Sequence, residues 1–388
     1  MKSRRYTLFV IYCLAFLTGI NFVVFPALGT VLTDDSIFKL SSSQFGNLFI
    51  PQVVCIITSS ILAPFLVNKW GPKLILIIGS ILMLVATGGL WSLQFVIDKT
   101  QILFPLLLVL AAFAGLGFGM NVTTLNPLAA SFFKEKQSSA ILILQFLVGL
   151  GTSTSPLMLT LLGDNSKWMD VPAIIFVTVF IVLILFMILK IENQKIFSLP
   201  NKTTIPSRLW WFVILIILYG LVEGTFGSFG TLLLKNKGVE NHSATLGLSL
   251  FWGGIAINRL LFGLFSNKIN LTKLYMAFPL AVAILLFFLS KSSESNILLA
   301  FMFGIGFFMG SLFPGSIGWA IVEFPQISVL VSGVLMAANQ VGTGIVTNVL
   351  GGFIKETDYV LVSLSIVTIV IFVLLIFLQK NSKIKDAF

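Results

Sequence analysis

The 388-residue sequence has few charged residues, a single histidine and two cysteines. Charged residues make up 10% of the chain, whereas they make up roughly a quarter of a soluble globular protein, so that class is excluded. Because His242 lies in a polar connection, the sequence offers neither a His/Cys metal cluster nor a Ser/His/Asp catalytic set. Cys13 and Cys55 fall within apolar runs, where cysteines act as small buried hydrophobic side chains.

A Gly-rich phosphate-binding loop followed by Lys and Ser or Thr is also missing. We therefore expect no ATP-driven transport, no enzyme activity, no cofactor and no metal. The formal net charge is +10, but the basic residues stand in short clusters between apolar runs and form no continuous stripe. We expect no nucleic-acid partner and interpret the clusters as signals for membrane topology.

Hydrophobic residues, in contrast, make up 57% of the chain, and the mean hydropathy is +1.05. Twelve segments are long enough to cross a hydrocarbon core of roughly 30 Å at about 1.5 Å per residue. The predicted fold class is therefore an all-α integral membrane protein with the lipid bilayer as its surroundings. The predicted spans cover residues 6–31, 43–68, 72–92, 103–130, 138–162, 171–191, 209–234, 243–267, 272–290, 296–322, 327–351 and 358–379.

The longest polar connection divides the spans into two groups of six. We predict an N-terminal six-helix bundle at 1–191, a cytoplasmic linker at 192–208 and a C-terminal six-helix bundle at 209–388. Residues of the first span recur in the seventh at an offset of 201, as the pairs Gly19 and Gly220, Phe25 and Phe226, Gly29 and Gly230, and Thr30 and Thr231. Such recurrence indicates a duplicated bundle with pseudo-symmetric halves.

The basic residues predict the orientation. With the N-terminus inside, sixteen Lys and Arg residues fall on the cytoplasmic side and seven on the other side, and Arg259 lies within a span. An excess of positive charge marks the cytoplasmic side of a membrane protein. We expect a multi-pass protein of the plasma (cytoplasmic) membrane with both termini in the cytoplasm, acting as a monomer.

A short basic turn follows span two and again follows span eight. The first turn runs from Pro64 to Lys73 and the second from Gly263 to Lys273, and their Asn-Lys pairs are 199 positions apart. With twelve spans and a six-plus-six repeat, the sequence resembles the major facilitator superfamily over nearly the whole chain. The turn of that family normally reads Gly-x-Leu-x-Asp-Arg-x-Gly-Arg-Lys, and here asparagine replaces the aspartate in both copies.

The resemblance implies a secondary transporter that works by alternating access, with the two turns locking the cytoplasmic side. The loss of both aspartates removes the negative charge from this lock. Hydrogen bonds from the asparagines to facing helix ends would take its place, at roughly half the strength of charge-assisted hydrogen bonds. Arg259, near the cytoplasmic end of its span, is expected to reach that end or to lock the bundles. The predicted gate residues are Asn68, Lys69, Gly71, Lys73, Arg259, Asn267 and Lys268.

Three features are similar to those of fucose permease-type sugar:proton symporters. They are the Gly115-x-Gly117-x-Gly119 run before Asn126-Pro127, the Tyr219-Gly220-x-x-Glu223 motif, and Asn258-Arg259. Members of that group carry carboxylates in spans one and four, where this chain has Asn21 and Val122. Proton coupling through those two positions is therefore not implied.

Glu223 is the one carboxylate placed deep in a predicted span. Because a charge at the bilayer centre costs at least about 2.5 to 3.5 kcal/mol, it needs a partner or a water-filled cavity. We predict that Glu223 binds the proton or the substrate. The alternative is a packing role in which it pairs with a donor such as Arg259.

Neutral polar residues fall in spans that line the central cavity of the resembled family. Amides donate and accept hydrogen bonds, and aromatic faces stack on sugars, so the set suits an uncharged polyhydroxy or amphipathic solute. Hydrogen bonding between helices would explain any single member equally well. The predicted substrate-binding residues are Asn21, Asn126, Gln145, Tyr219, Glu223, Trp252, Asn339 and Gln340.

Together these features predict a secondary active transporter that moves a small organic solute by alternating access and is driven by protons. An exporter of drugs or amphipathic metabolites from the same superfamily is one alternative. A membrane sensor that binds a solute without moving it is another.

Overall fold

The computed structural model describes residues 2–96, 100–132, 137–162, 167–188, 206–265, 272–324 and 327–380, which contain helices and no strands. In the N-terminal half the helices are α1 (Lys2–Phe22), α2 (Val24–Ala27), α3 (Gly29–Leu32), α4 (Ser42–Asn47), α5 (Phe49–Trp70), α6 (Pro72–Ser92), the 3-10 helix η1 (Leu93–Phe95), α7 (Thr100–Ser131), α8 (Gln137–Leu162) and α9 (Asp170–Ile188). In the C-terminal half they are α10 (Leu209–Asn236), α11 (Asn241–Phe265), α12 (Thr272–Lys291), α13 (Ser295–Met309), α14 (Leu312–Glu323), α15 (Ser328–Phe353) and α16 (Thr357–Lys380).

The described helices account for the twelve predicted spans. Ten segments are long and apolar enough to cross a membrane by length and composition, and Tyr6–Phe22 in α1 is a shorter apolar helix. Helices α1 to α3 make up the first span, α4 and α5 the second, and α13 and α14 the tenth, while α15 is the eleventh.

Proline and glycine explain where the chain bends. Pro26 lies in α2, and because proline lacks an N–H and clashes with the carbonyl four residues earlier, the first span breaks after Phe22. Gly71 has a φ of 82°, a conformation that favours glycine, and ends α5. Pro72 then begins α6, so the turn between the two helices is sharp.

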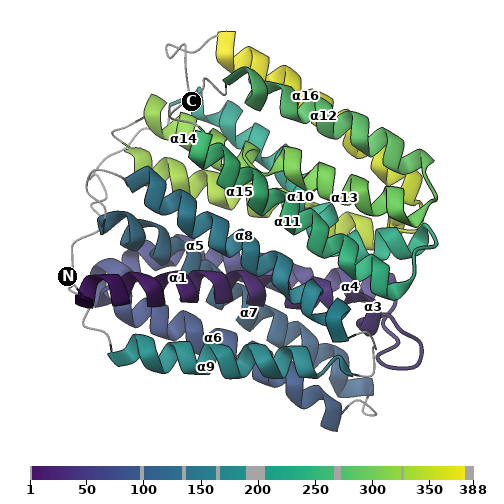
Figure 1. Cartoon of the computed structure of the whole chain (residues 1–388), viewed down its shortest axis with the longest axis horizontal. Coiled ribbons are helices and arrows are strands. Elements are labelled where there is room, and N and C mark those ends of the chain that lie inside the picture. The colour runs from purple at the N-terminus through teal and green to yellow at the C-terminus, as the bar shows by residue number, and fades with distance from the viewer. Residues whose placement is uncertain are drawn as a thin grey trace.

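The chain forms two bundles, seen in Figure 1 as a purple-to-teal lower half and a green-to-yellow upper half. In the N-terminal bundle the main packed pairs include α1 with α8, α5 with α7, and α6 with α9. The equivalent pairs of the C-terminal bundle, α10 with α15, α11 with α13, and α12 with α16, are packed in the same way. The repeated pairing agrees with the duplication predicted from the sequence.

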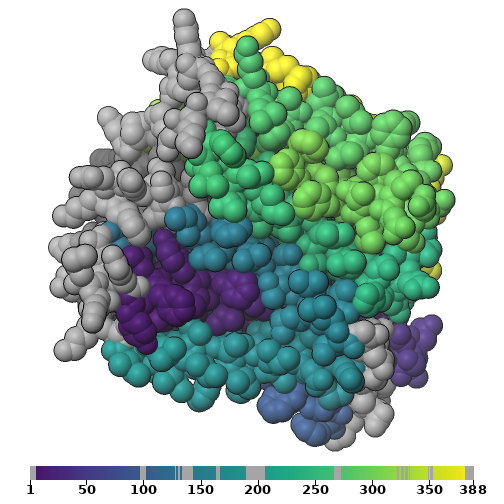
Figure 2. Space-filling view, in the orientation of Figure 1, coloured from purple at the N-terminus to yellow at the C-terminus, as the bar shows by residue number. Residues whose placement is uncertain are grey.

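Helix α1 begins and α16 ends at the left of Figure 1, which we call the terminal side. The other side, where α3 and α4 lie, is the opposite side. Figure 2 shows the surfaces of the two bundles in contact on one face of the molecule, where α8 packs against α11.

The two bundles touch at mid-depth and on the opposite side. The ring of Phe229 in α10 packs against those of Phe45 and Phe49, with centroids 6.1 and 5.9 Å apart. Deeper in the membrane, Ser153 of α8 and Ser249 of α11 each donate to the backbone carbonyl of the other, at 2.8 and 2.7 Å. These contacts close the space between the bundles toward the opposite side.

Candidate functional site

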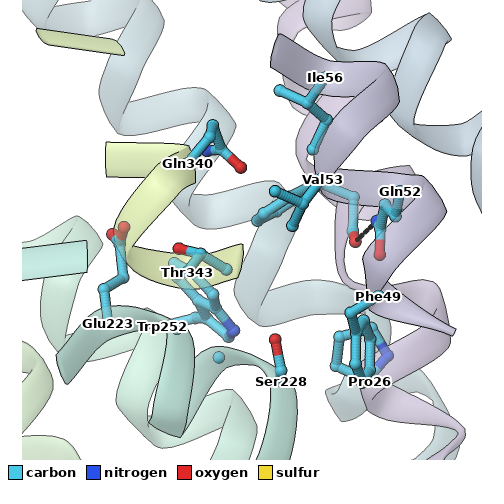
Figure 3. A pocket seen from close by; sticks show the side chains of 13 residues that line it. Pro26, Phe49, Gln52, Val53, Ile56, Glu223, Ser228, Trp252, Gln340 and Thr343 are labelled. Carbon is cyan, nitrogen blue, oxygen red and sulfur yellow. Dashed lines mark hydrogen bonds between the residues drawn. The ribbon is translucent and has the colours of Figure 1, made fainter. Parts of the chain in front are cut away.

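A cavity lies between the bundles at the depth where these contacts end. Its free volume of about 30 Å³ admits a water molecule or two but no sugar-sized solute. Figure 3 shows the lining side chains from both bundles facing one another. They are Phe22, Pro26, Phe49, Gln52, Val53 and Ile56 from the N-terminal bundle, and Glu223, Gly224, Gly227, Ser228, Trp252, Gln340 and Thr343 from the C-terminal bundle.

Two neighbours hold the carboxylate of Glu223. Tyr219 lies one helical turn earlier on α10, and its hydroxyl donates to Oε1 of Glu223 at 2.8 Å. Asn339 of α15 donates through Nδ2 to Oε2 at 3.0 Å. The ring of Tyr219 is fully buried and stacks on Phe313, with centroids 5.8 Å apart. The carboxylate therefore has a fixed position although it lies in the wall of the cavity.

Arg259 of α11 completes this cluster. Its Nη2 lies 4.0 Å from Oε1 of Glu223, and its Nε donates to the carbonyl of Gly310 at 3.0 Å. Both charged side chains are buried, with about a tenth of their surface exposed. The expectation that Arg259 reaches the end of its span is wrong, because the side chain points to Glu223. The alternative in which Glu223 pairs with Arg259 agrees with the observed geometry.

Two further predicted residues face the cavity with unused hydrogen-bonding atoms. Nε1 of Trp252 and Oε1 of Gln340 are buried and have no partner among the described residues. A buried polar atom without a partner costs about 1 to 3 kcal/mol, so both atoms gain from a ligand in the cavity. One is a donor and the other an acceptor, the pair that a hydroxyl group satisfies.

The three predicted residues of the N-terminal bundle are placed outside the cavity lining. Asn21 is fully buried, and its Nδ2 lies 3.4 Å from the carbonyl of Met83 in α6. Gln145 of α8 donates through Nε2 to Oδ1 of Asn126 in α7 at 2.9 Å. In this conformation all three connect helices within their own bundle, and their contact with a substrate stays a prediction.

Three polar lining residues were missed by the sequence reasoning. Gln52 donates to the carbonyl of Phe22 at 3.2 Å, Thr343 donates to that of Gly220 at 3.4 Å, and Ser228 also lines the cavity. Thr343 stands four residues after Asn339, so the two side chains lie on one face of the helix. This spacing could have identified Thr343 as a lining residue from the sequence.

Four of the predicted gate residues, Asn68, Lys69, Gly71 and Lys73, lie on the terminal side, whereas Arg259 lies beside Glu223 and its gating role stays a prediction. Asn68 and Lys69 are exposed at the end of α5, and the ammonium of Lys69 lies 5.4 Å from the ring centroid of Trp70. Lys73 donates to the carbonyl of Met187 in α9 at 2.7 Å, within its own bundle. A gating role of the turn stays a prediction. Two other predicted gate residues lie outside the described residues, namely Asn267 and Lys268.

No group of three or more His, Cys, Asp or Glu side chains within the described ranges is arranged to hold a metal ion. The chemistry of the site consists of hydrogen bonds and one ion pair, and it suits reversible binding of a solute and of a proton.

Comparisons with known proteins identify similar transporters in sequence and in fold. The chain is 23% identical over 347 residues to the glucose/mannose transporter GlcP of Bacillus subtilis (strain 168), covering 85% of this chain and 84% of that protein. A crystal structure of a mutant of the nucleoside transporter NupG superposes with a TM-score of 0.74 at 13% identity, over 96% of this chain and 99% of that chain. The crystal structure of a D-xylose-proton symporter gives a TM-score of 0.72 at 14% identity, over 94% and 97%.

The family model described as Major Facilitator Superfamily matches residues 8–347. The predicted all-α fold with twelve transmembrane helices is thereby confirmed. The chain belongs to the Major Facilitator Superfamily and is a multi-pass membrane protein that transports a small solute as a secondary transporter.

Proposed function

We propose that the protein takes up a neutral sugar-like solute together with protons, and that Glu223 binds the proton. The observation that carries the proposal is the buried carboxylate of Glu223 in the cavity wall, beside Arg259 and hydrogen-bonded to Tyr219 and Asn339. The relative from Bacillus subtilis is named a glucose/mannose transporter, and one structural neighbour is a D-xylose-proton symporter. Both names support a sugar-like substrate.

Protonation of Glu223 would couple the proton to the solute through Arg259. A neutral carboxyl group loses its attraction to the guanidinium 4.0 Å away. The arginine then gains from another acceptor, which a hydroxyl of the solute supplies. Trp252 and Gln340, with one unused donor and one unused acceptor, bind further hydroxyls. The empty and deprotonated cavity is stabilised by the ion pair, so the proton and the solute favour each other's binding.

We place the terminal side in the cytoplasm of the plasma membrane, as the sixteen-to-seven distribution of basic residues supports. The contacts of Phe229 with Phe45 and Phe49 then close the extracellular side, and uptake requires them to separate. We further propose that the protein acts as a monomer, with bundles at 1–191 and 209–388 joined by a cytoplasmic linker at 192–208.

Uptake of labelled glucose into proteoliposomes tests the function. We expect an imposed gradient with acid outside to drive accumulation, and uptake to fall as the external pH rises because the inward proton gradient becomes smaller. Glu223→Gln, which mimics the protonated group, is expected to keep counterflow of glucose and to lose the response to the gradient. Net outward movement would favour the exporter, and binding without counterflow would favour the sensor. Full gradient-driven uptake by Glu223→Gln would refute the proposed role of this residue.

A further inference from the structure

The C-terminal bundle has a groove on its outer surface, separate from the cavity between the bundles. Helix α10 packs against both α15 and α16, whereas α15 and α16 are not closely packed against each other along their described residues. Helix α10 therefore forms the floor of the groove, and the other two helices form its walls. The volume of the groove is about 490 Å³, which is the size of a small-ligand site.

The groove is apolar where it crosses the membrane. Leu221 lies on its floor, and Ile345, Val349 and Leu364 lie on its walls. Ile345 and Val349 are 46% and 53% exposed, so this surface of a spanning helix faces the hydrocarbon of the bilayer. Below the mouth the polar side chains of the lining are Thr225, whose hydroxyl donates to the carbonyl of Leu221, and Ser363. Because the rest of the lining there is aliphatic or aromatic, an acyl chain is the favoured occupant.

The depth of the groove matches one leaflet. On α16 it runs from Glu356, in the loop before the helix on the opposite side, to Leu364. Eight residues at about 1.5 Å each give about 12 Å, close to the roughly 15 Å that is half of the hydrocarbon core. A lipid of that leaflet can lie along the groove with its head group at Glu356.

The mouth of the groove carries a carboxylate that is free to bind a cation. Asp358 pairs with Lys237 at 2.7 Å, but no salt bridge between described residues uses Glu356. Tyr359, also at the mouth, is 76% exposed, and tyrosine is enriched at this level of membrane proteins because its ring is apolar and its hydroxyl is polar.

We propose that this groove binds one phospholipid with a primary-amine head group. The acyl chain lies between α15 and α16, and the ammonium donates to the carboxylate of Glu356. A trimethylammonium head group has the same charge but no N–H to donate, and an anionic head group is repelled by Glu356. The inner faces of α10 and α15 carry Glu223 and Asn339, so the lipid packs against the helix pair that forms the site. The proposal does not depend on the identity of the solute.

Native mass spectrometry of the delipidated full chain, titrated with palmitoyl-oleoyl phosphatidylethanolamine, phosphatidylcholine or phosphatidylglycerol, tests the head group. We expect half-saturation by the ethanolamine lipid at a concentration about twofold to tenfold lower than by the choline lipid, because both head groups carry the positive charge but only the ethanolamine donates a hydrogen bond to Glu356. Glu356→Gln should remove this preference. Glu240→Gln, which changes another exposed acid outside the groove lining, should keep it. Equal binding of all three lipids by the unaltered protein, or an unchanged preference in Glu356→Gln, would overturn the proposal.

A second pair of variants tests the groove itself. Val349→Trp fills it, and we expect loss of the tightly bound lipid of every head group. Val341→Trp changes a residue two turns earlier on α15 that is 42% exposed and outside the groove lining, and it should bind lipid as the unaltered protein does. Equal retention of the lipid by both variants would show that the acyl chain binds elsewhere. The thermal unfolding temperature of each variant, measured in parallel, identifies a general loss of structure.

Discussion

The two bundles share the backbone packing beside the cavity, but their side chains differ. A Cβ atom added to Gly19 of α1 would lie 2.0 Å from the carbonyl oxygen of Val148, and one added to Gly220 of α10 would lie 2.3 Å from that of Asn339. The helices of each pair therefore approach so closely that only glycine fits at both positions.

A second glycine on each partner helix repeats the match. A Cβ on Gly151 would lie 2.0 Å from the carbonyl oxygen of Phe16, and one on Gly342 would lie 2.2 Å from that of Ile217. Phe16 and Ile217 are 201 positions apart (217 minus 16), the same offset as Gly19 and Gly220. The duplication thus extends to individual backbone contacts.

The chemistry is not duplicated. At the same offset Glu223 corresponds to Phe22, and both residues line the cavity. The geometry also pairs Asn339 with Val148, so the residue that donates to Glu223 has an aliphatic counterpart. One bundle supplies the charges and the other a mostly apolar wall. The shared scaffold therefore positions the helices, while a few substitutions in one copy create the site.

Making the C-terminal bundle resemble the N-terminal one at Glu223 should have the largest effect. In Glu223→Phe the guanidinium of Arg259 stays buried without its carboxylate, and we expect the free energy of unfolding to fall by about 3 to 5 kcal/mol. Thermal and chemical unfolding in detergent measure the loss.

The second variant in this test is Glu223→Phe combined with Arg259→Leu, which removes both charges. We expect it to regain most of the stability and to show no proton-driven uptake. A double variant as unstable as the single one would mean that the ion pair is not the reason for the loss.

The shared scaffold makes a different prediction. Gly19→Ala and Gly220→Ala should each lower the free energy of unfolding by about 1 to 3 kcal/mol, because the added Cβ meets a backbone carbonyl that cannot move aside. Gly318→Ala in α14 is the control, since a Cβ there has no heavy atom within 4 Å. It should be neutral or stabilising by up to about 1 kcal/mol. A large effect in one bundle only would break the equivalence of the two helix pairs.

Exchanging the aligned side chains Asn339 and Val148 tests the chemical difference. Asn339→Val removes a hydrogen bond to a charged group, and we expect proton-driven uptake to fall about tenfold, equivalent to about 1.4 kcal/mol. Val148→Asn, in the bundle without the carboxylate, should leave uptake within about twofold of normal. Initial rates in proteoliposomes give both numbers, and equal losses would contradict the assignment of the site to the C-terminal bundle.

The smallest expected effect concerns the contact that joins the bundles. Ser153→Ala removes one hydrogen bond to Ser249, worth about 0.5 to 1.5 kcal/mol, and should shift the protein two- to tenfold toward opening on the opposite side. Distances between spin labels on the exposed residues Ser36 and Glu240 report this opening. Thr154→Ala is the control, because that hydroxyl bonds to Leu150 in its own helix. If the two variants gave the same distribution of distances, the hydroxyl of Ser153 would not stabilise the closed state of the opposite side.

Much of the site could be predicted from residue spacing. Tyr219 and Glu223 stand four residues apart, so their contact across one helical turn follows from the sequence. The depth of Glu223 follows from its place in an apolar span. Neither argument could locate Arg259, because the position of a residue along a span does not say whether a long side chain turns toward the rim or toward another helix.

The class of the protein, the number of its spans and the duplication of its halves follow from the order of its residues, because the bilayer imposes a length and a polarity on every span. The packing of the helices was needed to show that Asn339 and Arg259 meet at Glu223, that Gln52 and Thr343 reach the cavity, and that Asn21 stays inside its own bundle. The reason is that helical periodicity defines a face, whereas the neighbour of that face depends on how the helices are rotated and packed.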